Sequence, residues 1–182
     1  MNMDNPVLTA IRERRSTVRF KPAEVDDDKI QKILDAGRWA PSFANIQPWE
    51  FILVTDPDLK SQLSQIGVRI TLFSQGINEA SAVIVVVVDP EKDPYHYIED
   101  GSVATQNMAL AAHSIGLSTY WIGLFNLQKT RETAEETVKK ILDIPDKLRV
   151  IALLPIGAPA YPETSDRKRL IDIVHYDKYK RV

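Results

Sequence analysis

Residues 39–51 form the part of the sequence best suited to binding a flat ligand. The segment combines aromatic rings, short polar side chains and prolines: Trp39, Phe43, Trp49, Ser42, Asn45, Gln47, Pro41 and Pro48. Because proline fixes φ and removes an N–H donor, the two prolines constrain the backbone at both ends. A heteroaromatic ligand with polar edges needs this combination of apolar faces and hydrogen-bonding groups. The same composition also suits a well-packed loop, so the segment alone leaves binding and packing open.

Positive charge gathers in two other segments. Arg14 and Arg15 precede Ser16 near the expected end of a first helix, and Arg167 and Arg169 lie in the C-terminal tail. A phosphate monoester needs about two cations and several N–H or O–H donors, which these residues together could supply. Alternatively, the first group compensates the dipole of a helix C-terminus, worth about 0.3–1 kcal/mol, and the second is a solvated surface.

Familiar catalytic motifs are absent from the sequence. There is no glycine-rich dinucleotide fingerprint, no phosphate-binding loop, no HExxH zinc motif and no GxSxG nucleophile motif. The histidines His96, His113 and His175 are scattered, and there is no cysteine. If the protein is an enzyme, a bound cofactor is therefore expected to carry the chemistry.

The composition is that of an ordinary globular domain. The chain has 182 residues, enough for one domain with a substantial core, and a net charge of −2. That charge gives no reason to expect nucleic acid or an anionic membrane as a partner. The N-terminus shows no signal-peptide pattern, and the longest strictly apolar run, residues 82–88, is too short to span a membrane. We therefore expect a cytoplasmic protein.

Hydrophobic periodicity predicts alternating helices and strands. Helices are expected from residue 7 to about 14, from 26 to before Pro41, around 59–66, at 98–114, and after a cap at Thr130 or Thr133; strands are expected at 51–54, 82–88, 117–122, 148–156 and 171–174. Residues 82–88 show no polar alternation, which predicts a central strand buried on both faces. The irregular order favours an α+β fold, with a mixed central β-sheet flanked by helices, over a doubly wound fold. The alanine-rich helix 98–114 fits either a subunit interface or a core position.

Several motifs, in this order, resemble the FMN-dependent nitroreductase family, and in particular its smaller members. They are residues 14–20, residues 40–49, residues 79–85, the alanine-rich helix, residues 116–123 and the ending 167–177. The resemblance covers nearly the whole chain. It implies a single nitroreductase-like domain over residues 1–182 that forms an intertwined homodimer with two FMN sites at the subunit interface. The tail, from about residue 160 to 182, would pack on the partner subunit.

The resemblance also assigns roles to individual residues. It places Arg14, Arg15 and Ser16 at the FMN phosphate, with Arg167 and Arg169 near it. Pro41, Ser42 and Asn45 match the loop that reaches the flavin from the other subunit. Ile122, Gly123 and Leu124 match a turn against the flavin ring, with a backbone N–H directed at N5, and Gln75 matches a polar residue on the pyrimidine. No side chain is assigned a catalytic role, because the flavin carries the chemistry.

One departure from the family pattern bears on the flavin potential. Members commonly have Arg or Lys at the position of Val18, where a cation near flavin N1 stabilises the reduced flavin. Arg19 or Arg69 could take that place. The connection between Val88 and Ile98 is short, as in the smaller members, and implies an open substrate pocket.

The leading functional hypothesis is an oxidoreductase that uses NADH or NADPH by a ping-pong mechanism. Its acceptors would be nitroaromatics, quinones or similar electron-poor small molecules. One alternative is other flavin chemistry on the same fold, such as dehalogenation, ring dehydrogenation or flavin fragmentation. A second is a flavin-binding regulatory dimer with little turnover. Nucleic-acid binding is disfavoured by the net charge and by the lack of a sustained basic face.

Overall fold

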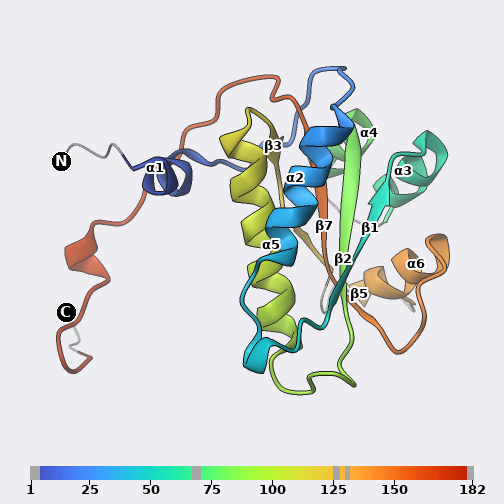
Figure 1. The fold of residues 1–182 in the computed structure, drawn as a ribbon. Coiled ribbons are helices and arrows are strands. Elements are labelled where there is room, and N and C mark those ends of the chain that lie inside the picture. The colour runs from blue at the N-terminus through green and yellow to red at the C-terminus, as the bar shows by residue number, and fades with distance from the viewer. Residues whose placement is uncertain (1–4, 67–70, 125–127, 130–131, 180–182) are drawn as a thin grey trace.

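A computed structural model describes residues 5–66, 71–124, 128–129 and 132–179 (Figure 1). The helices are α1 (Pro6–Glu13), α2 (Asp27–Arg38), α3 (Pro57–Ser64), α4 (Thr71–Glu79), α5 (Tyr97–Ser114) and α6 (Ala134–Ile141). The strands are β1 (Trp49–Val54), β2 (Ala82–Val88), β3 (Ser118–Thr119), β4 (Ile122–Gly123), β5 (Gln128–Lys129), β6 (Glu132–Thr133) and β7 (Arg149–Gly157). Short 3₁₀ turns lie at Phe43–Asn45 and Leu170–Asp172. The expected α+β class is confirmed.

The central sheet has the strand order β1-β2-β7-β3, and β4 also pairs with β7. All pairings between these strands are antiparallel. In the described residues, the parallel part of the expected mixed sheet is an isolated bridge between Ser16 and Thr119. A separate two-stranded sheet is formed by β5 and β6.

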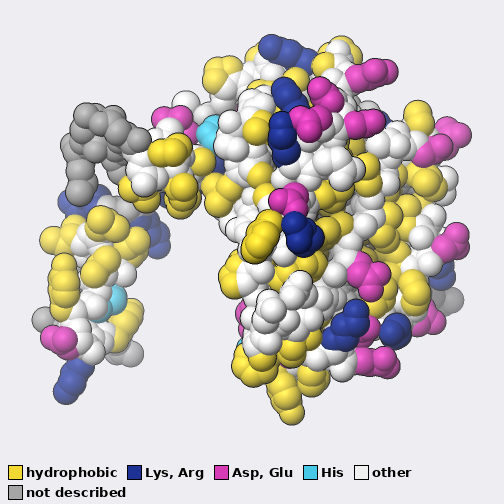
Figure 2. Space-filling view, viewed as in Figure 1, with side chains coloured by type: hydrophobic (Ala, Val, Ile, Leu, Met, Phe, Trp, Pro, Cys, Tyr) yellow, Lys and Arg dark blue, Asp and Glu magenta, His cyan; other side chains and the backbone are white. Residues whose placement is uncertain are grey.

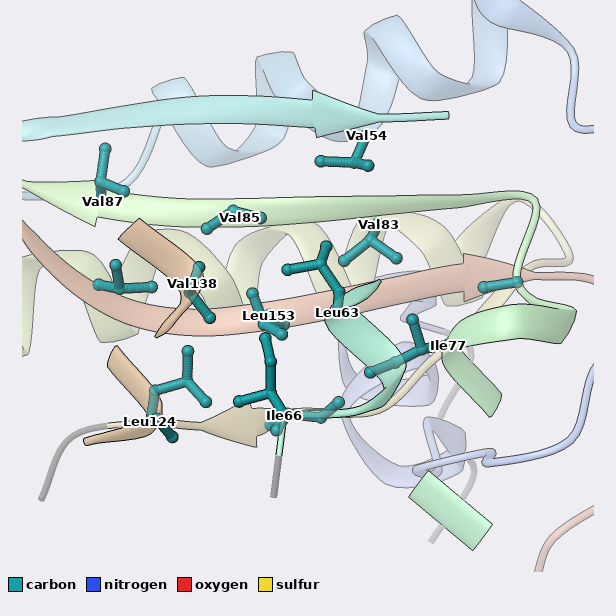
Figure 3. Close-up of a cluster of buried hydrophobic side chains, with 14 of the residues drawn as sticks. Val54, Leu63, Ile66, Ile77, Val83, Val85, Val87, Leu124, Val138 and Leu153 are labelled. Atoms are coloured by element: carbon teal, nitrogen blue, oxygen red, sulfur yellow. The ribbon is translucent and has the colours of Figure 1, made fainter. Parts of the chain in front are cut away.

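Strand β2 is buried on both faces, as its lack of polar alternation predicts. Its alternate side chains enter two different cores because successive residues of a strand point to opposite faces. Val83, Val85 and Val87 join a core with side chains of α3, α4 and α6 (Figure 3). Ile84 and Val86 join the core beneath α2 and α5. The sheet is therefore covered by helices on both sides (Figure 1).

The alanine-rich helix α5 packs into the second core. Ala104, Met108 and Ala112 are fully buried there, which favours the core position over the alternative of a subunit interface for these residues. A Cβ added to Gly37 of α2 would lie 2.8 Å from Met108 Cγ, closer than real side chains approach. The small residues thus allow α2 and α5 to pack closely against the sheet.

Most predicted elements are confirmed, and three details differ. The strand expected at 117–122 is divided into β3 and β4, with Tyr120 and Trp121 between them. The strand expected at 171–174 is wrong in the described chain, where a 3₁₀ turn is closed by an ion pair between Arg169 and Asp172. Helix α4 was not predicted from the sequence.

Helix α1 and the C-terminal segment stand away from the body of the molecule (Figure 1). Both carry exposed apolar side chains, visible in Figure 2: Val7 is 63%, Leu170 75% and Ile171 78% exposed. Apolar surface on projecting segments of this kind is typical of an interaction surface. Among the described helices, none is long and apolar enough to cross a membrane.

Candidate functional site

The structure brings together cations from the two ends of the chain. Arg14 caps helix α1, and its backbone N–H donates to the Ala10 carbonyl at 3.0 Å. The pKa of Arg14 is lowered by burial and, to a lesser extent, by the positive charges of Arg15 and Arg167. The first group of arginines and the tail therefore share one electrostatic environment, although they are more than 150 residues apart.

Arg15 is positioned by the end of the same helix. Its Nη1 donates to the carbonyls of Arg12, at 2.5 Å, and Arg14, at 2.8 Å. Its Nε is buried and has no hydrogen-bond partner among the described residues. Arg14, Arg15 and Arg167 form no ion pair with a carboxylate in the described part of the chain. A buried donor beside uncompensated cations fits an anionic ligand.

The segment after Arg15 is tied to the sheet, which fixes the place of Ser16. Ser16 pairs with Thr119 in the isolated bridge, and the Thr17 N–H donates to the Thr119 carbonyl at 3.0 Å. Thr17 is buried, whereas Ser16 is exposed next to the arginines. The hydroxyl of Ser16 is thus available as an additional donor.

The two arginines of the tail differ in their surroundings. Arg167 Nη1 donates to Ser165 Oγ at 2.7 Å and to the Asp166 carbonyl at 2.8 Å. Arg169 instead forms two hydrogen bonds to the Asp172 carboxylate, at 3.0 and 2.8 Å, and this contact raises the pKa of Arg169. Arg167 therefore contributes its charge to the Arg14 group, while Asp172 neutralises Arg169 locally.

The loop of residues 41–48 has an unusual backbone. Ala44, Asn45 and Gln47 have positive φ angles of 46°, 58° and 54°. This region is unfavourable for residues with a Cβ and persists only where the surroundings enforce it. Inside the loop, Ser42 Oγ accepts from the Gln47 N–H at 2.9 Å, and Gln47 Nε2 donates to Asn45 Oδ1 at 3.2 Å. Strain of this kind is concentrated at functional sites.

Two contacts fasten this loop to the body of the protein. The Asp89 N–H donates to the Pro48 carbonyl at 2.9 Å, and the Phe43 N–H donates to the Asp100 carboxylate. The Phe43 ring stacks on His96 with centroids 4.3 Å apart. Sequence reasoning missed Asp100, although an acidic residue in the first turn of a long buried helix was a visible signal.

Within one chain, the loop and the arginine group lie apart (Figure 1). The structure therefore does not bring Pro41, Ser42 and Asn45 to Arg14, Arg15 and Ser16 in a single subunit. Phe43 is exposed on the loop, and Trp39 is exposed at the end of α2 just before it. This separation is compatible with a loop that serves a neighbouring subunit.

The turn at 122–124 presents its backbone rather than its side chains. Ile122 and Leu124 are buried in the core, and β4 is held by β7 through the pairs Ile122↔Leu153 and Gly123↔Ala152. Gly123 is exposed, and a Cβ there would lie 3.4 Å from the Trp121 Nε1. A ligand that meets this turn would contact Gly123 and the peptide groups beside it.

Gln75 is exposed on α4 and hydrogen-bonds to Glu79. Glu79 also accepts from Arg19 Nε at 3.0 Å and from the Phe20 N–H at 3.1 Å. Arg19 is therefore engaged by Glu79 and is not a free substitute for the cation missing at Val18. Arg69 lies outside the described residues. No cluster of the described residues could hold a metal ion.

Comparison with known proteins identifies the family. The sequence model of the Nitroreductase family matches residues 11–68 and 69–158. The chain belongs to this family. It is 34% identical, over 94% of its length and 98% of the other, to the "Putative NADH dehydrogenase/NAD(P)H nitroreductase" of Archaeoglobus fulgidus.

Solved structures of the family have the same fold. A protein of the same name from Parabacteroides distasonis is 32% identical, with a TM-score of 0.87 over 97% of this chain and all of that one. An FMN-dependent nitroreductase from Clostridium difficile is 30% identical, with a TM-score of 0.87 over 94% of this chain and 99% of that one. The nitroreductase fold is therefore shown by both sequence and structure.

Proposed function

We propose that the protein is an FMN oxidoreductase that accepts hydride from NADH or NADPH and reduces an electron-poor small molecule by a ping-pong mechanism. The acceptors we expect are nitroaromatics, quinones and related compounds. The names of the relatives from Archaeoglobus fulgidus and Clostridium difficile support the nicotinamide and the FMN, respectively. Because its co-substrates are intracellular, the proposal places the enzyme in the cytoplasm.

The observation that carries this proposal is the group formed by Arg14, Arg15 and Arg167. A phosphate would supply the oxygen that the buried Arg15 Nε lacks and the negative charge that Arg14 and Arg167 lack. Each charge-assisted hydrogen bond contributes about 1.5–3 kcal/mol, so a few of them retain a cofactor tightly. The residues present thus fit the phosphate of FMN, with Ser16 as a further donor.

The chain's own residues would orient the flavin. When bound, the flavin supplies the hydride-accepting and electron-donating N5. Gly123 has no side chain to keep the ring away from the backbone, and Ile122 and Leu124 anchor the turn in the core. Gln75, exposed on α4, would face the pyrimidine. Protons for the reduced acceptor would come from solvent, since no acid or base is assigned to the site.

We further propose that the active form is a homodimer with the tail, from about residue 160, packed on the partner. The exposed apolar side chains of α1 and the tail support this assembly. In such a dimer, Pro41, Ser42 and Asn45 of one subunit would meet the flavin held by Arg14 of the other. A monomeric form should then retain FMN poorly even with all its arginines intact.

Mixed dimers test the shared site. Co-expression of an Arg14→Glu chain with a Ser42→Ala/Asn45→Ala chain, each with its own tag, yields a dimer that carries both defects. If the sites are shared, one of the two sites in the mixed dimer is intact and about half of the wild-type flavin is retained. If each subunit holds its own flavin, both sites are damaged and the mixed dimer is as poor as the two parent variants.

One observation favours a second candidate function. Val18 provides no cation, and Arg19 is engaged by Glu79. A flavin that lacks a nearby cation has a lower potential, which suits chemistry other than nitroreduction on the same fold. A regulatory dimer with little turnover is a different alternative. Such a dimer would hold FMN, but its flavin would not be reduced by nicotinamides.

The first test is whether the purified protein binds FMN. We expect a yellow protein that releases FMN, and not FAD, on heating, and whose absorbance bleaches anaerobically with NADH or NADPH. A colourless protein that cannot be loaded with FMN would contradict both enzyme functions. Loading without bleaching would identify a flavin-binding dimer instead.

A further inference from the structure

Two buried carboxylates lie beneath the 41–48 loop. Asp100, in the first turn of α5, is 5% exposed, and Asp93, in the preceding loop, is 1% exposed. The Phe43 N–H donates to both oxygens of Asp100, at 3.1 Å to Oδ1 and 3.3 Å to Oδ2. Asp93 Oδ1 accepts from the N–H groups of Tyr95 and His96, at 3.0 and 3.1 Å. Asp100 thus contacts the loop, and Asp93 lies behind it.

Among the described residues, the second oxygen of Asp93 has no hydrogen-bond partner. Asp93 Oδ2 and His96 Nδ1 are both buried without a partner in this part of the chain, and Nδ1 lies 3.6 Å from Asp93 Oδ1. The negative charge of Asp93 acts on Asp100, so the two buried carboxyl groups are electrostatic neighbours. Two neighbouring buried carboxylates share a proton because their like charges disfavour the ionisation of both. A proton on Asp100 would therefore be shared with Asp93.

The surroundings shift the pKa values of the two carboxyl groups in opposite directions. Burial and the charge of Asp93 raise the pKa of Asp100, although the Phe43 N–H opposes this. Burial acts to raise the pKa of Asp93 too, but its two backbone N–H donors and the His96 side chain together outweigh that effect and hold the pKa low. Among the described residues, the charge of His96 also acts on Asp100 and opposes the rise in its pKa, whereas residues 41–48 contain no charged side chain. As the pH falls, Asp100 is therefore the member of the pair that takes up the proton.

We propose that Asp100 is a positioning residue whose carboxylate holds the 41–48 loop in its flavin-binding conformation and whose protonation, shared with Asp93, releases that loop. The proposal rests on the function proposed above, because Ser42 and Asn45 matter only if they meet the flavin. The ionised carboxylate accepts the Phe43 N–H strongly, whereas the protonated group shares its proton with Asp93 and accepts more weakly. Phe43 is the contact through which Asp100 acts, since it begins the strained turn at 43–45.

Folding stability and the hold of Asp100 on the loop should change with pH in opposite directions. Because the pKa of Asp100 is raised in the folded state, its contribution to folding stability is present at low pH and is lost as the pH rises through that pKa. The hold on the loop changes in the opposite direction and is gained as the pH rises. A residue with a purely structural role would move stability and flavin affinity together, whereas a positioning role separates them.

The experiment follows the Phe43 amide in the flavin-free protein. The ¹⁵N–¹H signal of Phe43 is recorded between about pH 4 and 8, and FMN affinity is measured over the same range. Phosphate protonation also weakens FMN binding, so each wild-type affinity is compared with that of Asp100→Asn, which shares this effect. Asp56→Asn is the matched control, because Asp56 Oδ1 accepts the Leu59 N–H at 2.9 Å on the distant helix α3.

The proposal predicts a result for each of four proteins, the wild type and three variants. The wild-type Phe43 signal titrates with a midpoint above that of an ordinary aspartate. Below that midpoint the FMN affinity of the wild type falls, and this fall is roughly five- to tenfold larger than the fall in Asp100→Asn over the same pH range. In Asp100→Asn the titration of Phe43 disappears, and FMN affinity at neutral pH is roughly five- to tenfold weaker. In Asp93→Asn, which keeps the acceptor for Tyr95 and His96, the midpoint moves to lower pH. Asp56→Asn behaves like the wild type.

Other outcomes overturn the proposal in distinguishable ways. A Phe43 signal that does not titrate, or that titrates unchanged in Asp93→Asn, contradicts the proton-sharing pair even if Asp100→Asn fails to fold. A titrating signal with no change in FMN affinity relative to Asp100→Asn contradicts the positioning role while the proposed function stands. A wild-type protein that binds no FMN at any pH contradicts the proposed function, and with it the positioning role, even where Phe43 still titrates.

Discussion

Replacing Arg14 with alanine should weaken FMN binding without weakening the fold. Arg14 is half-buried beside Arg15 and Arg167, and no carboxylate of the described residues pairs with it. One charge-assisted hydrogen bond to a phosphate contributes about 1.5–3 kcal/mol. Since each 1.36 kcal/mol is about a factor of ten, the Kd for FMN should rise about 10- to 150-fold.

In the absence of flavin, Arg14→Ala should not lower the free energy of unfolding. Arg14→Ala removes a positive charge that is repelled by two others, so the free energy of unfolding should stay unchanged or rise by about 0–1 kcal/mol after screening by solvent. Arg169→Ala is the matched control, because Asp172 already engages that side chain. It should change the Kd by less than about threefold.

Titration calorimetry with FMN and thermal unfolding of the flavin-free variants measure both quantities. Wild-type affinity in Arg14→Ala would refute the assignment of the phosphate to this group of arginines. An equal loss in Arg169→Ala would show that Asp172 releases its arginine when FMN binds. A large drop in flavin-free stability for Arg14→Ala would show that the residue has a structural role instead.

Two further substitutions test the scaffold that positions the site, and a third is the control for one of them. Gly37→Ala should destabilise the protein by about 1–3 kcal/mol in chemical denaturation, because its Cβ would lie 2.8 Å from Met108 Cγ and force α2 away from α5; an unchanged midpoint would show that Met108 moves aside freely. Glu135→Ala should cost about 2–4 kcal/mol, because Glu135 binds Arg149 at 2.8 Å and the buried N–H of Val150 at 2.9 Å. Glu136→Ala, which loses an exposed capping contact, should cost clearly less, and an equal loss in both variants would contradict the role of burial.

Much of the fold follows from local patterns in the sequence. The unbroken apolar run of β2 predicts burial on both faces, and Gly116, with a φ of 79° that favours glycine, lies just after the end of α5. A cap at Thr130 or Thr133 was expected for α6, and in the structure Thr133 is the cap, through a reciprocal contact with Glu136. These features depend on neighbours within a few residues, which is why the sequence alone was sufficient.

Features that depend on distant contacts were not predictable in the same way. The apolar alternation at 171–174 favoured a strand, but strand formation needs a pairing partner, and the ion pair of Arg169 with Asp172 closes a turn instead. The engagement of Arg19 by Glu79 joins residues 60 positions apart. Asp100 acquires its importance only because Phe43 lies against it in the folded chain.

Two features of the candidate site agree with what the sequence indicates, while the roles of its residues stay predictions. The approach of Arg14 to Arg167 agrees with the phosphate interpretation of the two basic segments, and the strained backbone at Ala44 to Gln47 agrees with a functional loop. The burial of Ile122 and Leu124 shows that they support the turn through packing. Residue types alone do not reveal which atoms of a turn face outward.

Anaerobic stopped-flow absorbance of the FMN-loaded protein mixed with NADH or NADPH tests the central claim most directly. We expect the visible absorbance of the oxidised flavin to bleach with at least one nicotinamide and to return when a quinone or nitroaromatic is added. A loaded protein whose absorbance is unchanged by both nicotinamides would contradict the assignment as an NAD(P)H-dependent oxidoreductase.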